Sequence, residues 1–264
     1  INRGHHVRAG AREFFVKFNA AARAAMFEAE ADGLAEIAAT RTVRVPAPLC
    51  FGSDEQHAWL VLEWLPLSSH GLSREAATRL GERLAAMHAI SAKRFGWTRD
   101  NTIGSTPQIN QREQDWVEFW RKHRLRQQLE LAARNGYRGR LQSLGERLLE
   151  QMHNLFCGYQ PRPSLLHGDL WGGNAAAMEN GTPVLFDPAV YSGDREADLA
   201  MTELFGGFPS AFYGAYRAAA PLSAGYAVRR ELYNLYHVLN HLNLFGGAYL
   251  TQSESMMEEL LAEM

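Results

Sequence analysis

The chain has 264 residues, of which 46% are hydrophobic and 21% are charged, and this length suffices for one large or two moderate globular domains. The formal net charge of −2 provides no basic field, so we expect no nucleic acid as a partner. No stretch approaches the roughly 18 consecutive apolar residues of a membrane span, and no secretory leader stands at the start, which predicts a cytoplasmic protein without a membrane partner. Cys50 and Cys157 match neither a disulfide framework nor a zinc-ligand spacing, so we expect buried or free thiols.

The first part of the chain predicts a small α+β lobe. Residues 12–19, REFFVKFN, alternate in the manner of a strand, and the alanine-rich residues 21–39 have their large apolar side chains at helical spacing. Residues 45–52, VPAPLCFG, are interrupted by two prolines and end in a turn. The apolar run HAWLVLEWLPL, residues 57–67, predicts a well-buried strand. The expected order is therefore strand, helix, strand, strand.

After Ser68 the pattern becomes mainly helical. A capping-type serine, Ser73, opens the first helical segment. The predicted helical segments are residues 73–90, about 113–135, about 140–157, and the chain from Glu196 to its end. Short strands are predicted between residues 164 and 187, where Asn180-Gly181 is a hairpin signal. We therefore predict a nucleotide-binding lobe over residues 1–66 and a helical lobe over residues 67–264 that carries the hairpin.

The hairpin contains residues that phosphoryl transfer requires, namely a group that deprotonates the acceptor hydroxyl and oxygen ligands for Mg²⁺. The decapeptide LLHGDLWGGN places Asp169 five residues before Asn174, which is the separation of these two functions in protein kinases. Asp187 follows the apolar strand PVLF, where a second carboxylate ligand is expected. Each feature alone is common in turns and at strand ends. Their combination in one hairpin indicates a kinase site.

These segments resemble the fructosamine kinase, or ketosamine 3-kinase, family within the aminoglycoside-phosphotransferase and protein-kinase-like superfamily. The resemblance rests on LLHGDLWGGN and on PVLFDPAVYSGDREADLAMTELFGGFP, together with FFVKFN and FEAEADGL. Two further segments, FGWTRDNTIGSTPQIN and LYHVLNHLNLFGGAYL, are more specific to this family than the HGD motif. The resemblance covers essentially the whole chain. It implies a two-lobed α+β protein-kinase-like fold with a small antiparallel-sheet lobe and a larger helical lobe.

The resemblance also assigns roles to the residues that handle ATP and Mg²⁺. It implies that Asp169 is the catalytic base and that Asn174 and Asp187 hold Mg²⁺. Lys17 would contact the nucleotide phosphates, although a single lysine in a strand is usually only solvated. Glu30, in the next helix, would orient Lys17. Glu28 is a competing partner on another helix face.

Further residues have two interpretations each. The segment LVLEWLPL would be the hinge whose backbone near Glu63 and Leu65 binds adenine, or it is a plain buried strand. Trp171 would stack on a sugar or amine, or it packs in the core. Asp194 would face the substrate or support the structure.

Other polar residues are expected to have structural roles. His167 and Asp198 would support the catalytic loop, and Asp198 most resembles the aspartate that holds this loop in place in the family. His237 and His241 are spaced i, i+4 on a helix, but they lack the glutamate of the zinc-protease pattern. We expect these two histidines to pack, or to form hydrogen bonds on the substrate side, rather than to bind a metal.

The leading hypothesis is an ATP- and Mg²⁺-dependent kinase that phosphorylates a sugar hydroxyl of a ketosamine, free or protein-bound. The alternatives are a kinase for another small alcohol, such as an aminoglycoside, choline or a sugar, and a nucleotide-binding pseudokinase scaffold. The pseudokinase predicts loss of at least one of Lys17, Asp169, Asn174 or Asp187, and all four are present. The family has a glycine-bearing loop between its first two strands, and this chain begins at INRGHH, inside or just after that loop. We therefore expect the first lobe to lack its first strand and part of the loop, with about 20 to 30 further residues upstream.

Overall fold

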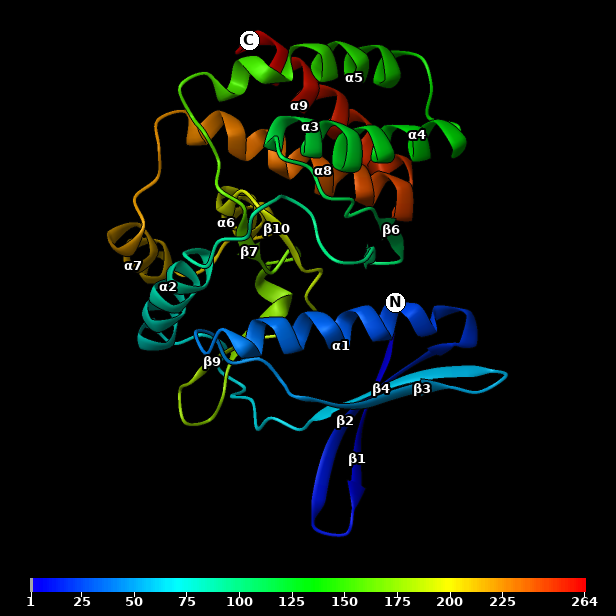
Figure 1. Ribbon diagram of the computed structural model, residues 1–264, viewed down its shortest axis with the longest axis vertical. Coiled ribbons are helices and arrows are strands. Elements are labelled where there is room, and N and C mark those ends of the chain that lie inside the picture. Colours follow the sequence, from blue (N-terminus) through cyan, green and yellow to red (C-terminus); the bar gives the residue numbers. More distant parts are fainter. Residues whose placement is uncertain (1) are drawn as a thin grey trace. The chain divides into compact units, whose positions relative to one another are not determined.

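A computed structural model describes residues 2–264 and divides the chain into two compact units, which are described separately (Figure 1). The first unit comprises residues 1–90, 167–190 and 205–221, and the second comprises residues 91–166, 191–204 and 222–264. The predicted lobe boundary at residues 66 and 67 is a different division of the chain and stays a prediction. No helix within residues 2–264 is long and apolar enough to cross a membrane.

The first unit is built on a four-stranded antiparallel sheet in the order β1-β2-β4-β3, with α1 packed against β3 and β4 (Figure 1). Its elements are β1 (Arg3–Ala9), β2 (Arg12–Ala20), α1 (Ala24–Ala39), β3 (Pro48–Ser53), β4 (His57–Glu63), α2 (Arg74–His88), β8 (Ala175–Ala177), β9 (Pro183–Leu185) and α7 (Ser210–Ala219). Residues of β4 point alternately to the two faces of the sheet. Ala58, Leu60 and Leu62 lie on the face that α1 covers and are buried. The predicted strand, helix, strand, strand order is confirmed from β2 onward.

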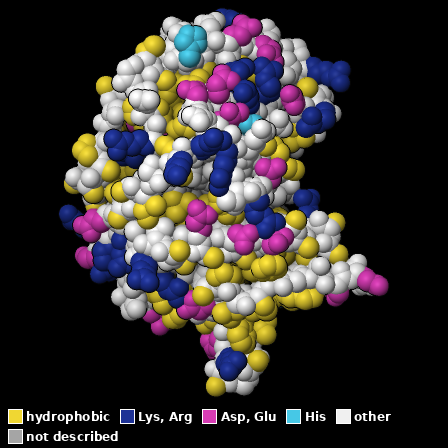
Figure 2. Space-filling model, viewed as in Figure 1, with side chains coloured by type: hydrophobic (Ala, Val, Ile, Leu, Met, Phe, Trp, Pro, Cys, Tyr) yellow, Lys and Arg dark blue, Asp and Glu magenta, His cyan; other side chains and the backbone are white. Residues whose placement is uncertain are grey.

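Strand β1 was missing from the sequence-based prediction. It pairs along its whole length with β2 through a turn at Gly10, whose φ is 62°. All seven residues of β1 are exposed, so the strand has no alternation between apolar and polar residues that could reveal it. Figure 2 shows this hairpin projecting from the first unit, with apolar side chains on it; Val7 and Phe18 are 38% and 36% exposed.

Helices α2 and α7 pack closely because one glycine removes the side chain between them. A Cβ atom on Gly81 of α2 would lie 2.4 Å from the carbonyl oxygen of Phe212 in α7. The same contact buries His88, whose Nδ1 lies 2.8 Å from the Tyr216 hydroxyl. Helix α2 also contacts β9. The predicted hairpin is confirmed: β8 pairs with β9, and Gly181 in its turn has a φ of 77°.

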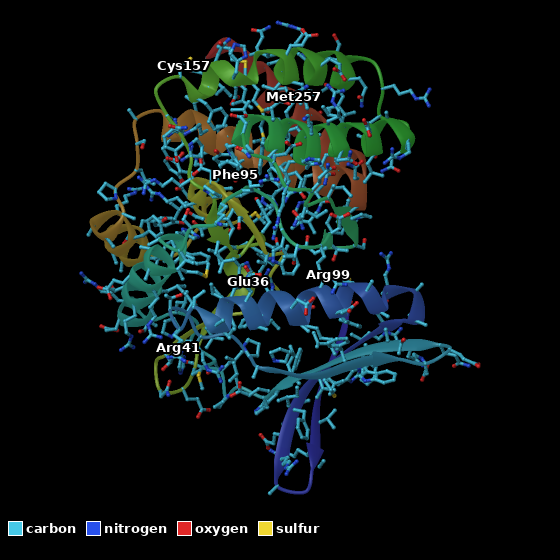
Figure 3. The ribbon with its side chains drawn as sticks, viewed as in Figure 1. Glu36, Arg41, Phe95, Arg99, Cys157 and Met257 are labelled. Carbon is cyan, nitrogen blue, oxygen red and sulfur yellow. The ribbon has the colours of Figure 1, made fainter. Side chains whose placement is uncertain are left out.

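The second unit is mainly helical. Its elements are β5 (Asn101–Ile103), β6 (Thr106–Gln108), α3 (Trp116–Trp120), a π-helical turn (Arg121–Leu125), α4 (Arg126–Arg134), α5 (Arg140–Gln151), β7 (Ser164–Leu166), β10 (Tyr191–Gly193), α6 (Arg195–Leu204), α8 (Tyr226–Phe245) and α9 (Leu250–Ala262). Helix α9 packs against α5 and α8, and its Met257 is fully buried (Figure 3). Cys50 of the first unit and Cys157 of the second are free and exposed.

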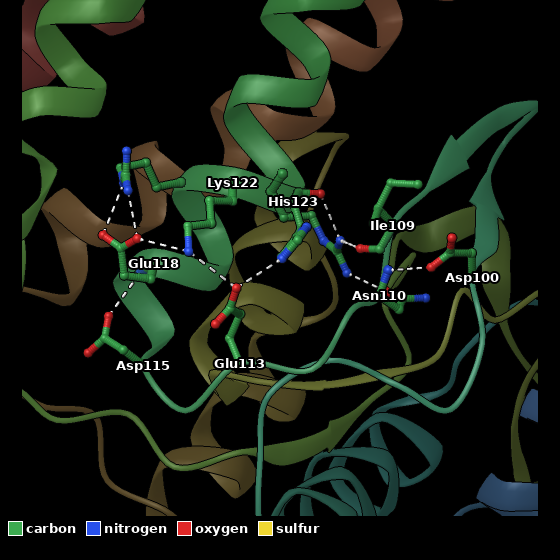
Figure 4. Close-up of polar contacts among 10 residues, drawn as sticks. Asp100, Ile109, Asn110, Glu113, Asp115, Glu118, Lys122 and His123 are labelled. Atoms are coloured by element: carbon green, nitrogen blue, oxygen red, sulfur yellow. Dashed lines mark hydrogen bonds and ion pairs between the residues drawn. The ribbon is translucent and has the colours of Figure 1, made fainter.

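The π-helical turn directs a charged side chain into the second unit. Arg124 is fully buried, and its guanidinium lies 4.7 Å from the ring of Phe119 and 4.1 Å from that of Tyr191. It donates hydrogen bonds to the Ile109 carbonyl at 2.6 Å and to Asn110 Oδ1 at 2.8 Å (Figure 4). Arg124 thereby fixes the segment after β6 to the helix that contains the π turn.

Candidate active site

A buried lysine joins the sheet, helix α1 and the end of the β8–β9 hairpin in the first unit. Lys17 Nζ lies 2.5 Å from Glu30 Oε1 and 2.5 Å from Asp187 Oδ1. The side chains of Lys17 and Glu30 are 5% and 10% exposed, whereas that of Asp187 is 49% exposed. Of the two glutamates considered as partners in α1, Glu30 therefore forms the ion pair with Lys17. The exposed carboxylate of Asp187 is the member that a ligand can reach.

The charges of this cluster hold Lys17 in its protonated form. Burial favours the neutral amine, but the carboxylates of Glu30 and Asp187 outweigh it, so that the pKa of Lys17 is raised above its usual value. Burial likewise raises the pKa of Glu30, against the opposing effect of Lys17. The cluster therefore presents a fixed cation, which is the group required beside the phosphates of a nucleotide.

Asp187 occupies an unusual backbone conformation directly after β9. Its φ is 57°, in the left-handed region that non-glycine residues rarely adopt. The preceding residue, Phe186, is held by both of its backbone polar groups. Its N–H donates to the Asn174 carbonyl at 3.1 Å, and the Phe186 carbonyl lies 3.0 Å from His167 Nε2. This turn directs the Asp187 carboxylate back toward Lys17.

The loop between β7 and β8 carries Asp169 and Asn174 and is ordered by its own polar contacts. Asn174 Nδ2 donates to the Asp169 carbonyl at 2.8 Å and to Asp169 Oδ2 at 3.2 Å. The Asp169 N–H donates to His167 Nδ1 at 3.3 Å, so His167 is the tautomer with its proton on Nε2. Gly168 has a φ of 81°, which lets the chain turn tightly before Asp169. The structure thus brings Asp169, Asn174 and Asp187 into one connected group.

The donor set fits a magnesium ion that is bound together with a nucleotide. Asn174 donates through its amide nitrogen, which leaves the amide oxygen as its ligand atom, and Asp187 offers a carboxylate. Within residues 2–264 there is no group of three His, Cys, Asp or Glu side chains that could hold a metal by themselves. Mg²⁺ is commonly bound by one or two carboxylates together with substrate phosphates and water. Asn174 and Asp187 would therefore hold the ion only with help from a phosphate.

The predicted hinge lies at the end of β4, and its polar groups are partly used inside the protein. The Glu63 N–H donates to the Ala47 carbonyl at 2.9 Å, and Glu63 Oε2 accepts from the Ala47 N–H at 3.1 Å. The Trp64 ring stacks on His6 of β1 with centroids 3.7 Å apart. Leu65 is buried. The Glu63 N–H is therefore engaged, and the adenine-binding role of Glu63 and Leu65 stays a prediction.

Trp171 presents an exposed aromatic surface two residues after Asp169. It is 39% exposed, and its ring lies edge-to-face with that of Phe205 at 6.3 Å between centroids and an angle of 79°. A Cβ atom on Gly173 would lie 2.4 Å from the indole, so the glycine is required for this ring position. Phe205 was not predicted from the sequence, and its only signal is the run Phe-Gly-Gly after a helix.

The remaining predicted residues belong to the second unit. Asp194 is buried and accepts hydrogen bonds from the Tyr159 hydroxyl at 2.9 Å and the Tyr233 hydroxyl at 2.6 Å. Burial, with the nearby charge of Glu196, raises the pKa of Asp194 to about 6. These contacts favour structural support over substrate binding for Asp194. Asp198 is also buried, in α6.

The two histidines of α8 show the features of packed residues. His237 is buried, and burial lowers its pKa to about 3. His241 Nδ1 lies 2.7 Å from the His237 carbonyl, which is a hydrogen bond within the helix. This geometry agrees with packing and a local hydrogen bond for the pair.

The fold and the site together define a phosphotransferase of the protein-kinase-like class. The chain belongs to the fructosamine kinase family, whose model matches residues 1–263. It is 48% identical over 262 residues to a Synechocystis protein named as a probable ketoamine kinase, covering 99% of this chain and 87% of that protein. It is 43% identical over 264 residues to the chloroplastic protein-ribulosamine 3-kinase of Arabidopsis thaliana, covering 99% and 80%.

Solved structures give the same result. A Haemophilus somnus protein named as a putative fructosamine-3-kinase has a TM-score of 0.90 and 29% identity, covering 99% of this chain and 88% of that one. A thermostable mutant of an aminoglycoside phosphotransferase shares the fold with a TM-score of 0.64 and 15% identity, covering 99% and 90%. The predicted family and fold class are confirmed. As a member of this kinase family, the chain is expected to use ATP.

Proposed function

We propose that the chain phosphorylates a sugar hydroxyl of ketosamines, the adducts of sugars with lysine or protein amines, with ATP and Mg²⁺. The carrying observation is the connected group of Lys17, Glu30, Asp187, Asn174 and Asp169 within one compact unit. It offers a cation for phosphates, oxygen ligands for a divalent ion and a carboxylate for a hydroxyl proton. The names of the relatives, ketoamine kinase and protein-ribulosamine 3-kinase, support this acceptor class.

Each residue has a defined task in the proposed reaction. Asp169 accepts the proton of the sugar hydroxyl as the hydroxyl oxygen bonds to the γ-phosphorus and ADP departs. Lys17, oriented by Glu30, binds phosphate oxygens, and Asn174 and Asp187 hold Mg²⁺. When bound, the ion neutralises charge on the phosphates. Catalysis therefore comes from positioning and charge compensation, with no covalent enzyme intermediate.

The exposed aromatic pair gives a reason for the preference for an amine-bearing sugar. Trp171 and Phe205 present ring surfaces beside the catalytic loop. A ketosamine carries a secondary amine that is protonated near neutral pH, and ring faces attract cations. We assign the binding of this ammonium to Trp171, whose indole is held by Phe205. Separately, we propose that the reaction takes place in the cytoplasm.

A substrate panel tests the proposal. ATP turnover with Mg²⁺ is measured against ribulose-lysine, fructose-lysine, an aminoglycoside and choline, with Asp169→Asn as the blank. The proposal expects transfer to a sugar-lysine that is lost in Asp169→Asn while ATP binding is kept. Transfer only to the aminoglycoside or choline would reject the ketosamine acceptor and keep the kinase mechanism. ATP binding without transfer to any acceptor would favour the pseudokinase.

A further inference from the structure

One arginine of the first unit contacts both the end of β4 and the strand that leads to Asp187. The Arg44 guanidinium donates to Glu63 Oε1 and to the Val45 carbonyl. Its backbone carbonyl accepts a hydrogen bond from the Leu185 N–H at 2.9 Å, and Arg44 forms a parallel bridge with Val184. A single residue therefore connects β4 with β9.

The contacts at the β4 end fix the point where the predicted hinge begins. Glu63 is the last residue of β4, and both of its carboxylate oxygens are engaged, one by Arg44 and the other by the Ala47 N–H at 3.1 Å. The side chains of Arg44 and Glu63 are 34% and 35% exposed, so water partly screens the attraction between their charges. Arg44 thus helps to fix the Glu63 side chain at the end of β4.

The contacts at the β9 end fix the metal carboxylate. Leu185, which Arg44 holds, precedes Asp187 by two residues, and the intervening Phe186 N–H is bound to the Asn174 carbonyl at 3.1 Å. A displacement of β9 would therefore move Asp187 relative to both Asn174 and Lys17. Arg41, labelled in Figure 3, lies in the turn after α1 with a φ of 57°, three residues before Arg44.

We propose that Arg44 is a positioning residue that couples nucleotide binding at the hinge to magnesium binding at Asp187. A nucleotide held at the end of β4 and an ion held at the end of β9 would each favour the same arrangement of Arg44, so each would strengthen the binding of the other. The inference rests on the proposed use of ATP and Mg²⁺, but it does not depend on the identity of the acceptor.

The test measures ATP binding to the full chain by titration calorimetry, in Mg²⁺ and in EDTA, without an acceptor. The ratio of the two dissociation constants is the magnesium enhancement. Arg44→Met keeps the backbone bond to Leu185 but removes the side-chain contact with Glu63, so we expect it to lower this ratio about five-fold, the lower end of the usual coupling between two sites. Arg44→Lys should restore part of it, because lysine keeps the charge but has no planar fork.

The chain offers a matched control on the same hairpin. Arg79 donates to the Gly181 carbonyl at 2.7 Å in the β8–β9 turn and thus holds the opposite end of β9. Arg79→Met should leave the magnesium enhancement unchanged. If Arg44→Met does not fold, as judged by its melting curve, Glu63→Gln gives the same test, because the amide oxygen still accepts from Ala47.

An unchanged enhancement in Arg44→Met, or an equal decrease in Arg79→Met, would overturn the inference. The double variant Arg44→Met with Glu63→Gln should be no worse than Arg44→Met alone, since both act through one contact; additive losses would also contradict the coupling. Failure of the acceptor assignment gives a different pattern, namely normal magnesium enhancement without transfer to any ketosamine.

Discussion

Replacing Lys17 with methionine tests whether the cluster of Lys17, Glu30 and Asp187 holds the first unit together as well as binding phosphate. Methionine keeps much of the volume but leaves two carboxylates facing each other, one of them buried. Removing one partner of a buried ion pair costs about 3–5 kcal/mol. Because Asp187 is half exposed, we expect the lower end, about 3 kcal/mol, at neutral pH.

The predicted loss of stability in Lys17→Met depends on pH, and the direction of this dependence follows from Glu30. Burial already raises the pKa of Glu30, and loss of the Lys17 charge removes the influence that lowers it. A carboxyl group with a raised folded pKa stabilises the fold below its unfolded pKa, and this stability is lost as pH rises through the folded pKa. The variant should therefore approach wild-type stability at acidic pH and fall behind as the pH rises to 8.

Native-state hydrogen exchange of the β2 and α1 amides at pH 5 and pH 8 measures the effect in the first unit alone. Lys122→Met is the matched control, because Lys122 also has two carboxylate partners, Glu113 at 3.3 Å and Glu118 at 3.4 Å, but is exposed. The control should leave exchange in β2 and α1 unchanged. Equal protection in Lys17→Met and wild type at pH 8, or a loss that does not vary with pH, would refute the reasoning.

Three further outcomes follow from particular contacts. Gly81→Ala should destabilise the chain by about 1–3 kcal/mol, because its Cβ would meet the Phe212 carbonyl. Gly214→Ala on α7 should not destabilise it, because that Cβ meets nothing within 4 Å, and melting curves compare the two variants. Because the folded pKa of Asp194 is raised to about 6, the wild type should lose stability relative to Asp194→Asn as the pH rises through that value. Urea titrations of both proteins at pH 4.5 and 7.5 measure this difference. Trp171→Ala should raise the KM for a ketosamine about two- to five-fold and leave that for an uncharged ether analogue unchanged, which steady-state kinetics with both acceptors would measure.

The sequence could predict the parts of the site that are local. Asp169 and Asn174 lie in one loop, so their spacing of five residues already determines that they can meet. Asp187 ends an apolar strand whose hairpin turn is marked by Asn180-Gly181. The pair of Lys17 and Glu30 required the family resemblance, because residue spacing alone left Glu28 open.

Residues that act through distant partners had no comparable signal. Arg44 acquires its place by pairing with Val184 in β9, a contact that no local pattern marks. Asp194 is held by Tyr159 and Tyr233, which come from separate segments, so its burial could not be inferred from its neighbours. Strand β1 was missed for the opposite reason, because full exposure removes the alternation by which strands are found.

In the proposed mechanism, metal binding would be a property of the nucleotide complex more than of the free protein. Asn174 and Asp187 provide the ligand oxygens in our assignment, and Asp187 already shares one oxygen with the Lys17 ammonium. An octahedral ion needs six oxygens, so phosphates and water must complete the set. Since Lys17 stays protonated, a nucleotide polyphosphate brings the negative charge that lets the ammonium and a divalent ion lie close together. Since the nucleotide and the ion would each favour the binding of the other in this charge balance, a connection such as Arg44 between the end of β4 and the end of β9 would serve to couple them.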